Sequence, residues 1–461
     1  MMQALSLAEI ARVLGVKAPA AAGSARDICT DTRALQPGDL FVALRGERFD
    51  GHGFLETARE VGAVAAVVDT ADAKVALPQL VVPDTIQALA DLARRNRELS
   101  DARVIAVTGS SGKTTLKEML SAILSNEGAT LATLGNLNNH IGAPLTLFRL
   151  SPKHRYAVIE LGASGVGEIT HTVAATRPEV AVITNAGEAH LEGFGSYENI
   201  VLAKGEIIDG VVDGGTVVLN RDDPAFGTWK KRAGNRRVVS VSARGDAADY
   251  RCIGYRFGDG AYTIQVETPD HGERSLVLKL PGEHNICNAL LAMAAAEAVG
   301  AGDTAVRQGL EAVRPAAGRL ERKRLNDRVT VIDDSYNANP TSMKAALDVL
   351  AREASTRVAV LGGMAELGPE GDRLHREVGE HARNQGIEQL LVVGTTEGCD
   401  ALVSGFGDDA RRFDTHQQAV EWLLAHMTGP MTVLVKGSRS SAMDQVVKML
   451  QEKVNNPCCS G

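Results

Sequence analysis

The sequence predicts an α/β protein of several domains built on mainly parallel sheets, and three observations carry that prediction. A chain of 461 residues is long enough for two to four domains. Short apolar segments followed by glycine-rich or polar turns alternate with helix-length stretches, which is typical of doubly wound sheets. Aromatic residues make up only 4% of the chain, so the core must be built from Ala, Val, Leu and Ile, which suits buried parallel strands.

The order of these segments divides the chain into three blocks. The predicted blocks cover residues 1–83, 84–316 and 317–461. In the first block, residues 39–44 and 63–69 are predicted strands with a helical pattern between them, and the first 15 residues of the chain also read as a helix. The second block has six apolar strands and then, over 250–280, a period of two that predicts antiparallel strands, followed by an alanine-rich helix over 285–299. Four further strands alternate with helices in the third block, which is therefore a second α/β domain.

Composition excludes several classes of protein. The formal net charge of -8 argues against a large basic surface for nucleic acid. Six scattered cysteines without a C-x-x-C pair indicate reduced thiols. There is no uninterrupted apolar stretch of about 18 residues, which a transmembrane helix needs, and the start of the chain lacks the basic region of a signal peptide. We therefore expect a cytoplasmic protein that acts on small molecules, and nothing in the sequence demands more than a monomer.

The segment VIAVTGSSGKTT has the order of a strand, a glycine turn and a helix start. Backbone N–H groups of such a turn surround phosphate oxygens, and the helix N-terminus adds positive potential. Lys113 would reach the β- and γ-phosphates of ATP, and Thr114 or Thr115 would bind magnesium. Val107 stands where the general pattern has glycine, and a turn without a ligand is the alternative. The predicted ATP-binding residues of this loop are Gly109, Ser110, Ser111, Gly112, Lys113, Thr114 and Thr115.

Two further strands end next to ionisable side chains. Glu160 closes the strand YAVIE, and a carboxylate at that edge of a nucleotide-binding sheet suits magnesium. Glu188 and His190 follow the strand VAVIT, which favours a metal or phosphate role for His190. A solvated acid and a structural histidine are the alternatives, and the neighbouring phosphate loop favours function. Lys204 lies in a helical stretch, where a lysine reads as a solvated cation.

Polar residues near the junction of the second and third blocks are further candidates. Asn285 and Asn288 share one face at the start of the alanine-rich helix, with helix capping as the alternative. Arg319 lies near the junction, where a guanidinium group can hold a phosphate through two hydrogen bonds. Asp334 opens the segment DSYNANP, whose Asn and Pro residues predict a turn after a strand.

Six motifs together resemble the Mur ligases of bacterial peptidoglycan synthesis: TGSSGKTT, GNLNNHIGAP, NAGEAHLEGFGS, GEHNICNALLA, GRL and DDSYNANP. They follow one another in order through nearly the whole chain. The resemblance implies an N-terminal domain for a UDP-linked substrate, a central ATPase domain, and a Rossmann-like C-terminal domain that closes over the nucleotide. The segments DTR, PGDLFVAL, FDGHGF and VLGGMAELG resemble the family member that joins D-Ala-D-Ala to UDP-MurNAc-tripeptide.

The resemblance also implies roles for individual residues. Lys204 is similar to a lysine that is carbamylated in the family, which would turn a cation into an anionic magnesium ligand. The implied catalytic residues are Lys113, His190, Lys204 and Arg319, and the implied Mg2+ ligands are Thr114, Glu160, His190 and Lys204. The implied further contacts of ATP are Asn285, Asn288, Arg319, Asp334 at the ribose, and Asn136 or Asn139 at the γ-phosphate. The implied substrate contacts are Asp31, Thr32, Arg33, Asp50, His52, Asn337, Lys436 and Ser438.

The implied reaction has two steps. The terminal carboxylate of the tripeptide attacks the γ-phosphate of ATP to give an acyl phosphate, and the amine of D-Ala-D-Ala then displaces phosphate. Because two anions meet in the first step, Mg2+ and Lys113 must neutralise charge. One rival is the ligase that adds diaminopimelate or lysine, whose Asp-Asn-Pro-Arg motif is absent from the sequence. A folylpolyglutamate synthase lacks the DTR and FDGH segments of the first block, and a nucleotide-dependent switch would form no covalent product.

Overall fold

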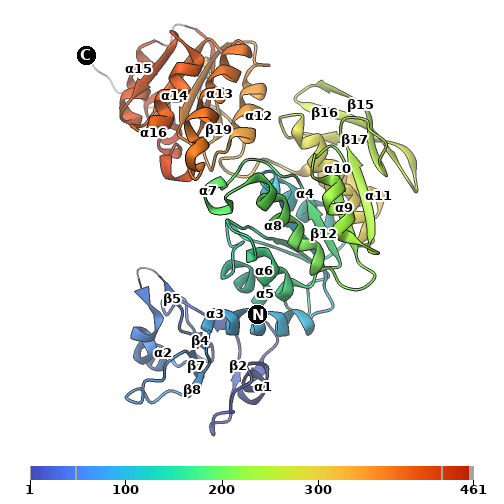
Figure 1. Ribbon diagram of the computed structural model, residues 1–461, viewed down its shortest axis with the longest axis vertical. Helices are drawn as coiled ribbons and strands as arrows, with labels where there is room; N and C mark the ends of the chain where they lie inside the picture. Colours follow the sequence, from blue (N-terminus) through green and yellow to red (C-terminus); the bar gives the residue numbers. More distant parts are fainter. Residues whose placement is uncertain (1, 47–48, 427–428, 456–461) are drawn as a thin grey trace.

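The computed structural model describes residues 2–46, 49–426 and 429–455. Its strands form three larger sheets, one in each predicted block, and two short two-stranded pairings. The N-terminal and C-terminal domains lie at opposite ends of the molecule with the central domain between them (Figure 1). This arrangement confirms the predicted three-domain α/β class. The block boundaries after residues 83 and 316 stay a prediction.

The N-terminal domain is built on a four-stranded parallel sheet in the order β3-β4-β7-β8. The two predicted strands are confirmed as β4 and β7, each shorter than expected. The helix predicted over the first 15 residues spans only Leu7–Val13, because Leu5–Ser6 pairs with Ser24–Ala25 as a short strand. The elements are β1 Leu5–Ser6, α1 Leu7–Val13, β2 Ser24–Ala25, β3 Ile28–Cys29, β4 Leu40–Val42, β5 Arg45–Gly46, β6 Phe49–Asp50, a 3-10 turn η1 Gly51–Phe54, α2 Leu55–Val61, β7 Ala65–Val68 and β8 Gln79–Val81.

The central domain contains a nine-stranded sheet in the order β10-β11-β9-β12-β13-β14-β15-β16-β17. The predicted antiparallel segment is confirmed as β15, β16 and β17, and β15 joins the large sheet by pairing in parallel with β14. The strands are β9 Arg103–Thr108, β10 Thr130–Ala132, β11 Tyr156–Glu160, β12 Val180–Ile183, β13 Thr216–Asn220, β14 Arg237–Ser242, β15 Tyr250–Gly258, β16 Ala261–Thr268 and β17 Gly272–Leu278. Because β9 lies between β11 and β12, the turns that follow these three strands meet at one edge of the sheet.

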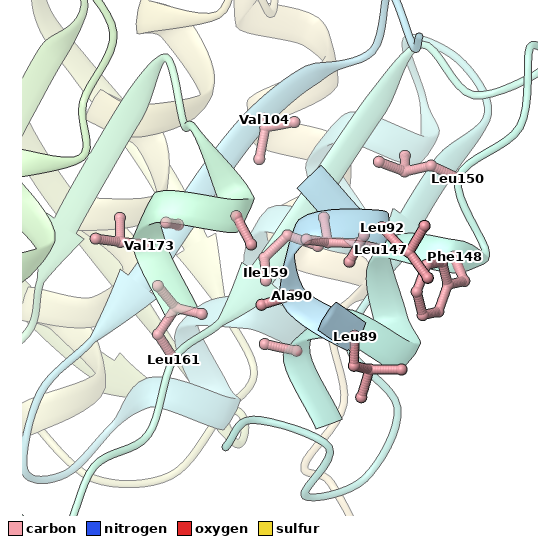
Figure 2. Packing of buried hydrophobic residues seen from close by; sticks show 14 of the residues in the cluster. Leu89, Ala90, Leu92, Val104, Leu147, Phe148, Leu150, Ile159, Leu161 and Val173 are labelled. Carbon is pink, nitrogen blue, oxygen red and sulfur yellow. The ribbon is translucent and has the colours of Figure 1, made fainter. Parts of the chain in front are cut away.

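Helices cover both faces of this sheet. The helices are α3 Thr85–Glu98, α4 Lys113–Ser125, α5 Gly142–Phe148, α6 Glu168–Thr176, α7 Leu191–Phe194, α8 Tyr197–Asp209, α9 Phe226–Ala233, α10 His284–Ala298 and α11 Asp303–Ala312. Alternate residues of β9 point to opposite faces, so Val104 packs with α3, α5 and α6, whereas Ile105 packs with α4 and α10. Figure 2 shows Leu89 and Leu92 of α3 in one cluster with Leu147 of α5. The helix that leads out of the N-terminal domain is thus part of the central core.

The C-terminal domain has a six-stranded sheet in the order β18-β19-β23-β20-β21-β22. All its pairings are parallel except that of β18 with β19. The four predicted strands are confirmed as β19, β20, β21 and β23. The elements are β18 Glu321–Arg324, β19 Val329–Asp334, α12 Pro340–Leu350, β20 Thr356–Gly362, η2 Gly368–Glu370, α13 Gly371–Asn384, β21 Gln389–Val393, α14 Glu397–Phe406, β22 Ala410–Phe413, α15 His416–Ala425, β23 Met431–Lys436, η3 Arg439–Ser441 and α16 Asp444–Asn455. Across the described ranges, no helix has the length and apolar character needed to span a bilayer.

Candidate functional site

Two adjoining cavities, of about 980 Å³ and 780 Å³, surround the phosphate loop where the central and C-terminal domains face each other. Predicted residues that line the first cavity are Ser110, Ser111, Gly112, Lys113, Thr114, Thr115, Asn136, Asn139, Glu160, His190, Arg319, Asn337 and Ser438. Predicted residues that line the second are Ser111, Gly112, Thr115, Asn285, Asn288, Arg319, Asp334 and Lys436. The fold therefore gathers residues from the other five motifs around the phosphate loop.

The phosphate loop is held in shape by the segment that follows β12. The N–H of Ser110 donates to the carbonyl oxygen of Asn185 at 3.0 Å, and Thr184 Oγ1 donates to the carbonyl oxygen of Ser111 at 2.6 Å. Gly109 has φ +147°, and a β-carbon there would lie 1.9 Å from Thr184 Oγ1, so only glycine fits. Val107, which departs from the general pattern, is a buried residue of β9.

Lys113 opens α4 and turns back toward the loop, with Nζ donating to the carbonyl oxygen of Gly109 at 2.7 Å. Burial lowers the pKa of this lysine, the nearby Glu160 carboxylate raises it, and Arg319 lowers it. The ammonium group is thus a desolvated donor beside a carboxylate and a guanidinium group. This arrangement suits an anionic ligand, because its negative charge adds to that of Glu160 beside the two cationic groups.

Glu160 has one carboxylate oxygen in use and one free. Asn138 Nδ2 donates to Oε1 at 2.8 Å, whereas Oε2 is buried without a hydrogen-bond partner in the described parts of the chain. A buried carboxylate oxygen without a partner is costly unless a cation or water meets it. Residues 2–46, 49–426 and 429–455 bring no three His, Cys, Asp or Glu side chains together as a metal site. The Glu160 carboxylate by itself fits Mg2+, which binds one or two carboxylates and takes its other ligands from phosphate and water.

The three asparagines of the GNLNNHIGAP motif have different roles. All three line the first cavity, and Asn136 is the first of them along the chain. Asn138 orients Glu160, which sequence reasoning missed, because that contact is made between segments 22 residues apart. Asn139 Oδ1 accepts from the N–H groups of Ile141 and Gly142, at 3.2 and 2.8 Å, at the start of α5. Of the two alternatives at the γ-phosphate, Asn136 is the one whose side chain is not used in this way.

His190 lies at the interface with the C-terminal domain. It has a left-handed backbone, with φ +57°, and precedes the short helix α7. Its Nδ1 contacts the Glu366 carboxylate of the C-terminal domain, and the N–H of Glu192 donates to the carbonyl oxygen of Glu366 at 3.0 Å. Sequence reasoning missed Glu366, since a contact across 176 residues leaves no local signal.

The interpretation of Lys204 as a solvated cation is wrong. The side chain is 1% exposed within α8, where Nζ donates to the carbonyl oxygen of Ala163 at 3.2 Å and lies 4.8 Å from the centre of the Phe194 ring. Burial lowers the pKa of Lys204 to about 7, and the charge of Lys113 adds to that shift. The described residues that line the two cavities do not include Lys204 or Gly109, although Ala163 lines the first.

Asn285 and Asn288 connect the second cavity to the phosphate loop. Asn288 Nδ2 donates to Asn285 Oδ1 at 2.9 Å, and Asn285 Nδ2 donates to the carbonyl oxygen of Pro281 at 2.6 Å. Asn285 lies inside α10, so the capping alternative is wrong. Gly112, at φ +79°, packs directly against Asn288.

The C-terminal residues of the site pair with one another. Lys436 Nζ lies 2.6 Å from Asp334 Oδ2 and donates to the carbonyl oxygen of Asn337 at 2.9 Å. Burial lowers the pKa of Lys436, and Asp334 opposes that shift. The Arg319 guanidinium lies 4.3 Å from the centre of the Tyr336 ring. The ion pair of Asp334 with Lys436 thus forms part of the lining of the second cavity.

The five N-terminal candidates do not line either cavity. Arg33 pairs with Asp31 at 2.6 Å and holds the pKa of that carboxyl at about 2. His52 Nδ1 contacts Asp50 at 2.7 Å, and its Nε2 accepts from the N–H of Asp69 at 3.2 Å. These residues, with Thr32 beside the first pair, form a polar surface within the N-terminal domain. Sequence reasoning missed Asp69.

Comparison with known proteins covers almost the whole chain. Family models match residues 26–97 (Mur ligase family, catalytic domain), 107–296 (Mur ligase middle domain) and 318–439 (Mur ligase, glutamate ligase domain). The UDP-N-acetylmuramoyl-tripeptide–D-alanyl-D-alanine ligase of Escherichia coli (strain K12) is 43% identical over 457 residues, which cover 99% of this chain and 100% of that one. The ligase of the same name from Bacillus subtilis (strain 168) is 33% identical and covers 92% and 93%.

Solved structures give the same result. MurF from Acinetobacter baumannii superimposes with a TM-score of 0.92 at 35% identity, covering 98% of this chain and 100% of that one. MurF ligase from Thermotoga maritima in complex with ADP superimposes with a TM-score of 0.85 at 27% identity, covering 94% and 99%.

Proposed function

The chain belongs to the Mur ligase family, and we propose that it joins D-alanyl-D-alanine to UDP-N-acetylmuramoyl-tripeptide at the expense of ATP. The products are the UDP-linked pentapeptide, ADP and phosphate, and the reaction is a step of peptidoglycan precursor synthesis. The observation that carries this assignment is the 43% identity to the Escherichia coli ligase over its full length. The dependence of the proposed reaction on ATP supports a cytoplasmic location for this protein. Both cavities are formed within one chain, which supports a monomer.

Activation of the tripeptide begins in the first cavity. The terminal carboxylate of the tripeptide attacks the γ-phosphate of ATP, which yields an acyl phosphate and ADP. Lys113 is placed to meet the phosphate oxygens once it leaves the carbonyl oxygen of Gly109, and Arg319 adds a second positive charge. Bound Mg2+ would neutralise the charge that accumulates as the two anions approach. The amine of D-alanyl-D-alanine then attacks the acyl carbon, and phosphate departs.

The residues that would hold Mg2+ come from four segments of the central domain. They are Thr114, Glu160, His190 and, after carbamylation, Lys204. Glu160 Oε2 is the best supported of them, because it is buried without a partner in the described residues. For Lys204, the support is a buried amine with a pKa near neutrality, since only a neutral amine attacks carbon dioxide to give the carbamate and a proton.

The remaining substrate contacts are divided between domains. The polar surface with Asp31, Thr32, Arg33, Asp50 and His52 supports binding of the UDP end in the N-terminal domain. Asn285, Asn288 and Asp334 in the second cavity support binding of adenosine, with Asp334 at the ribose. Asn337 and Ser438 in the first cavity support contacts with the peptide substrates. Lys436 is already paired with Asp334, which favours an indirect role for it.

The deciding experiment measures ADP release with UDP-MurNAc-tripeptide and each candidate amine. We expect turnover with D-alanyl-D-alanine and none with diaminopimelate, and the reverse result would reassign the enzyme within the family. Hydroxylamine capture of the acyl phosphate separates a ligase from a nucleotide-dependent switch. Absence of the hydroxamate at saturating substrates would favour the switch.

A further inference from the structure

The loop before α7 and the loop after β20 dock on each other between the central and C-terminal domains. Figure 1 shows α7 at the end of the central domain that faces the C-terminal domain. Besides the side-chain contact of His190 with Glu366, the backbone of Glu192 is hydrogen-bonded to Glu366. Leu191 packs against the core of the C-terminal domain, with Met364 and Leu367 in the same cluster. The contact therefore joins two backbones, an imidazole ring with a carboxylate, and an apolar side chain.

The backbone on both sides of this contact is held in an uncommon conformation. His190 has φ +57° and Glu366 has φ +61°, both left-handed, and neither is glycine. Non-glycine residues persist in that region only where the surrounding structure holds them there. On the C-terminal side, the N–H of Met364 donates to His375 Nε2 at 2.8 Å, which anchors the loop two residues before Glu366. The backbone around Glu366 is thus held by contacts within its own domain.

The chemistry of the contact fixes the state of the histidine ring. A carboxylate oxygen accepts hydrogen bonds, so His190 Nδ1 must carry the proton that it donates to Glu366. In the neutral ring, Nε2 then keeps its lone pair. A histidine that binds a metal through one nitrogen is commonly oriented by a carboxylate at the other. His190 lines the first cavity together with Glu160 and Thr114.

We propose that Glu366 is a positioning residue, which orients His190 and fixes its Nδ1-protonated form across the domain interface. The inference rests on the proposed function, in which His190 faces the metal and the phosphates. Its consequence is that the metal site becomes complete only when the C-terminal domain, which carries Asp334 and Lys436, is docked. Docking of the C-terminal domain then encloses the nucleotide and completes the metal site in the same step.

Three variants test this role. Glu366→Ala removes the acceptor, whereas Glu366→Gln keeps an amide oxygen that accepts the same N–H. Arg373→Ala is the matched control, because Arg373 lies 3.7 Å from Glu188 at the same interface, half exposed and without contact with His190. We expect Glu366→Ala to lower kcat by about 10–100-fold and to weaken Mn2+ binding in the presence of ADP by a similar factor. The KM for UDP-MurNAc-tripeptide stays within about twofold, Glu366→Gln recovers most of the loss, and Arg373→Ala stays within about threefold, as exposed ion pairs contribute little.

A spectroscopic readout follows His190 without any turnover. The ¹⁵N-imidazole spectrum of the full chain with ADP, with the His190 signals identified from a His190→Gln variant, reports which ring nitrogen carries the proton. We expect the Nδ1-protonated form in the wild type and in Glu366→Gln, and a shift toward the Nε2-protonated form in Glu366→Ala. An unchanged ring signal with unchanged Mn2+ affinity in Glu366→Ala would overturn the proposal. Equal losses in Glu366→Ala and Arg373→Ala would also overturn it, since the effect would then be docking alone. Failure of the wild type to turn over D-alanyl-D-alanine would instead count against the proposed function and leave the spectroscopic test in place.

Discussion

The Lys113 ammonium group donates to the carbonyl oxygen of Gly109, 2.7 Å away, within the same phosphate loop. The lysine is therefore already hydrogen-bonded within the loop before a nucleotide enters. Exchange of the carbonyl oxygen for a phosphate oxygen replaces a neutral acceptor by a charged one, which strengthens the hydrogen bond.

Replacement of Lys113 by alanine should abolish ligation and spare the N-terminal domain. We expect kcat/KM to fall by at least about 10³-fold, because a preorganised donor to the transferred phosphate is lost. The dissociation constant of UDP-MurNAc-tripeptide should stay within about twofold. ADP release and calorimetric titration measure the two quantities. Loss of both in a variant that keeps its fold would contradict the division of substrates between domains.

The backbone of the phosphate loop should be intolerant of a side chain at Gly109. In Gly109→Ala the new β-carbon meets Thr184 Oγ1 at 1.9 Å, so either the loop or the segment after β12 must move. We expect ATP binding to weaken by about 5- to 150-fold, the equivalent of a strain of about 1–3 kcal/mol. Gly227→Ala is the control, because it lies in α9 with open space around its Cα and should bind ATP normally. Fluorescent nucleotide titration with melting curves separates the two variants.

Neighbouring asparagines should give different phenotypes. Asn138→Ala frees the Glu160 carboxylate, so we expect the Mg2+ concentration for half-maximal activity to rise about 10–100-fold. Asn139→Ala removes the acceptor at the start of α5 and should lower the free energy of unfolding by about 1 kcal/mol. Magnesium titration and denaturant unfolding measure the two effects. A stability loss in Asn138→Ala with an unchanged magnesium requirement would contradict this division of roles.

Carbamylation of Lys204 should depend on pH in the neutral range. The pKa of the amine is lowered from 10.5 to about 7, so the fraction that is neutral and able to attack carbon dioxide rises as pH passes through about 7. After acid treatment and removal of carbon dioxide, reactivation by bicarbonate should be faster at pH 8 than at pH 6. A Lys204→Ala variant should be inactive and regain activity with a short added carboxylate. Full activity of that variant without any additive would refute an essential role.

The sequence predicts the buried central strands of the fold better than the edge strands of the sheets. Central strands such as β9 and β23 are continuous apolar runs, and their period and flanking glycines identify them. The edge strands Glu321–Arg324 and Ala410–Phe413 are rich in charged residues, so their composition does not distinguish them from loops, and only pairing with a neighbour makes them strands. The parallel junction of β14 with β15 likewise depends on tertiary contacts.

The same distinction applies to the site. Lys113, Glu160 and His190 follow three apolar strands, and the rule that parallel strands end at one edge places them together. Glu366 and Asn138 act through contacts with distant partners, so no local pattern marks them. For Lys204 the local pattern was misleading. Its place in a helical stretch predicted an exposed side chain, whereas the fold buries it.

The strand order of the C-terminal sheet has a consequence for synthesis of the protein. β23, residues Met431–Lys436, lies between β19 and β20, so these two strands have no hydrogen-bonded neighbour in common until it is in place. In the central domain, by contrast, each strand from β13 to β17 pairs with its immediate predecessor. The central sheet can therefore grow in step with the ribosome, while the C-terminal domain must wait for nearly the whole chain. A chain that stops before residue 431 should retain a folded centre and expose one unpaired edge on each of β19 and β20, a target for proteolysis and aggregation.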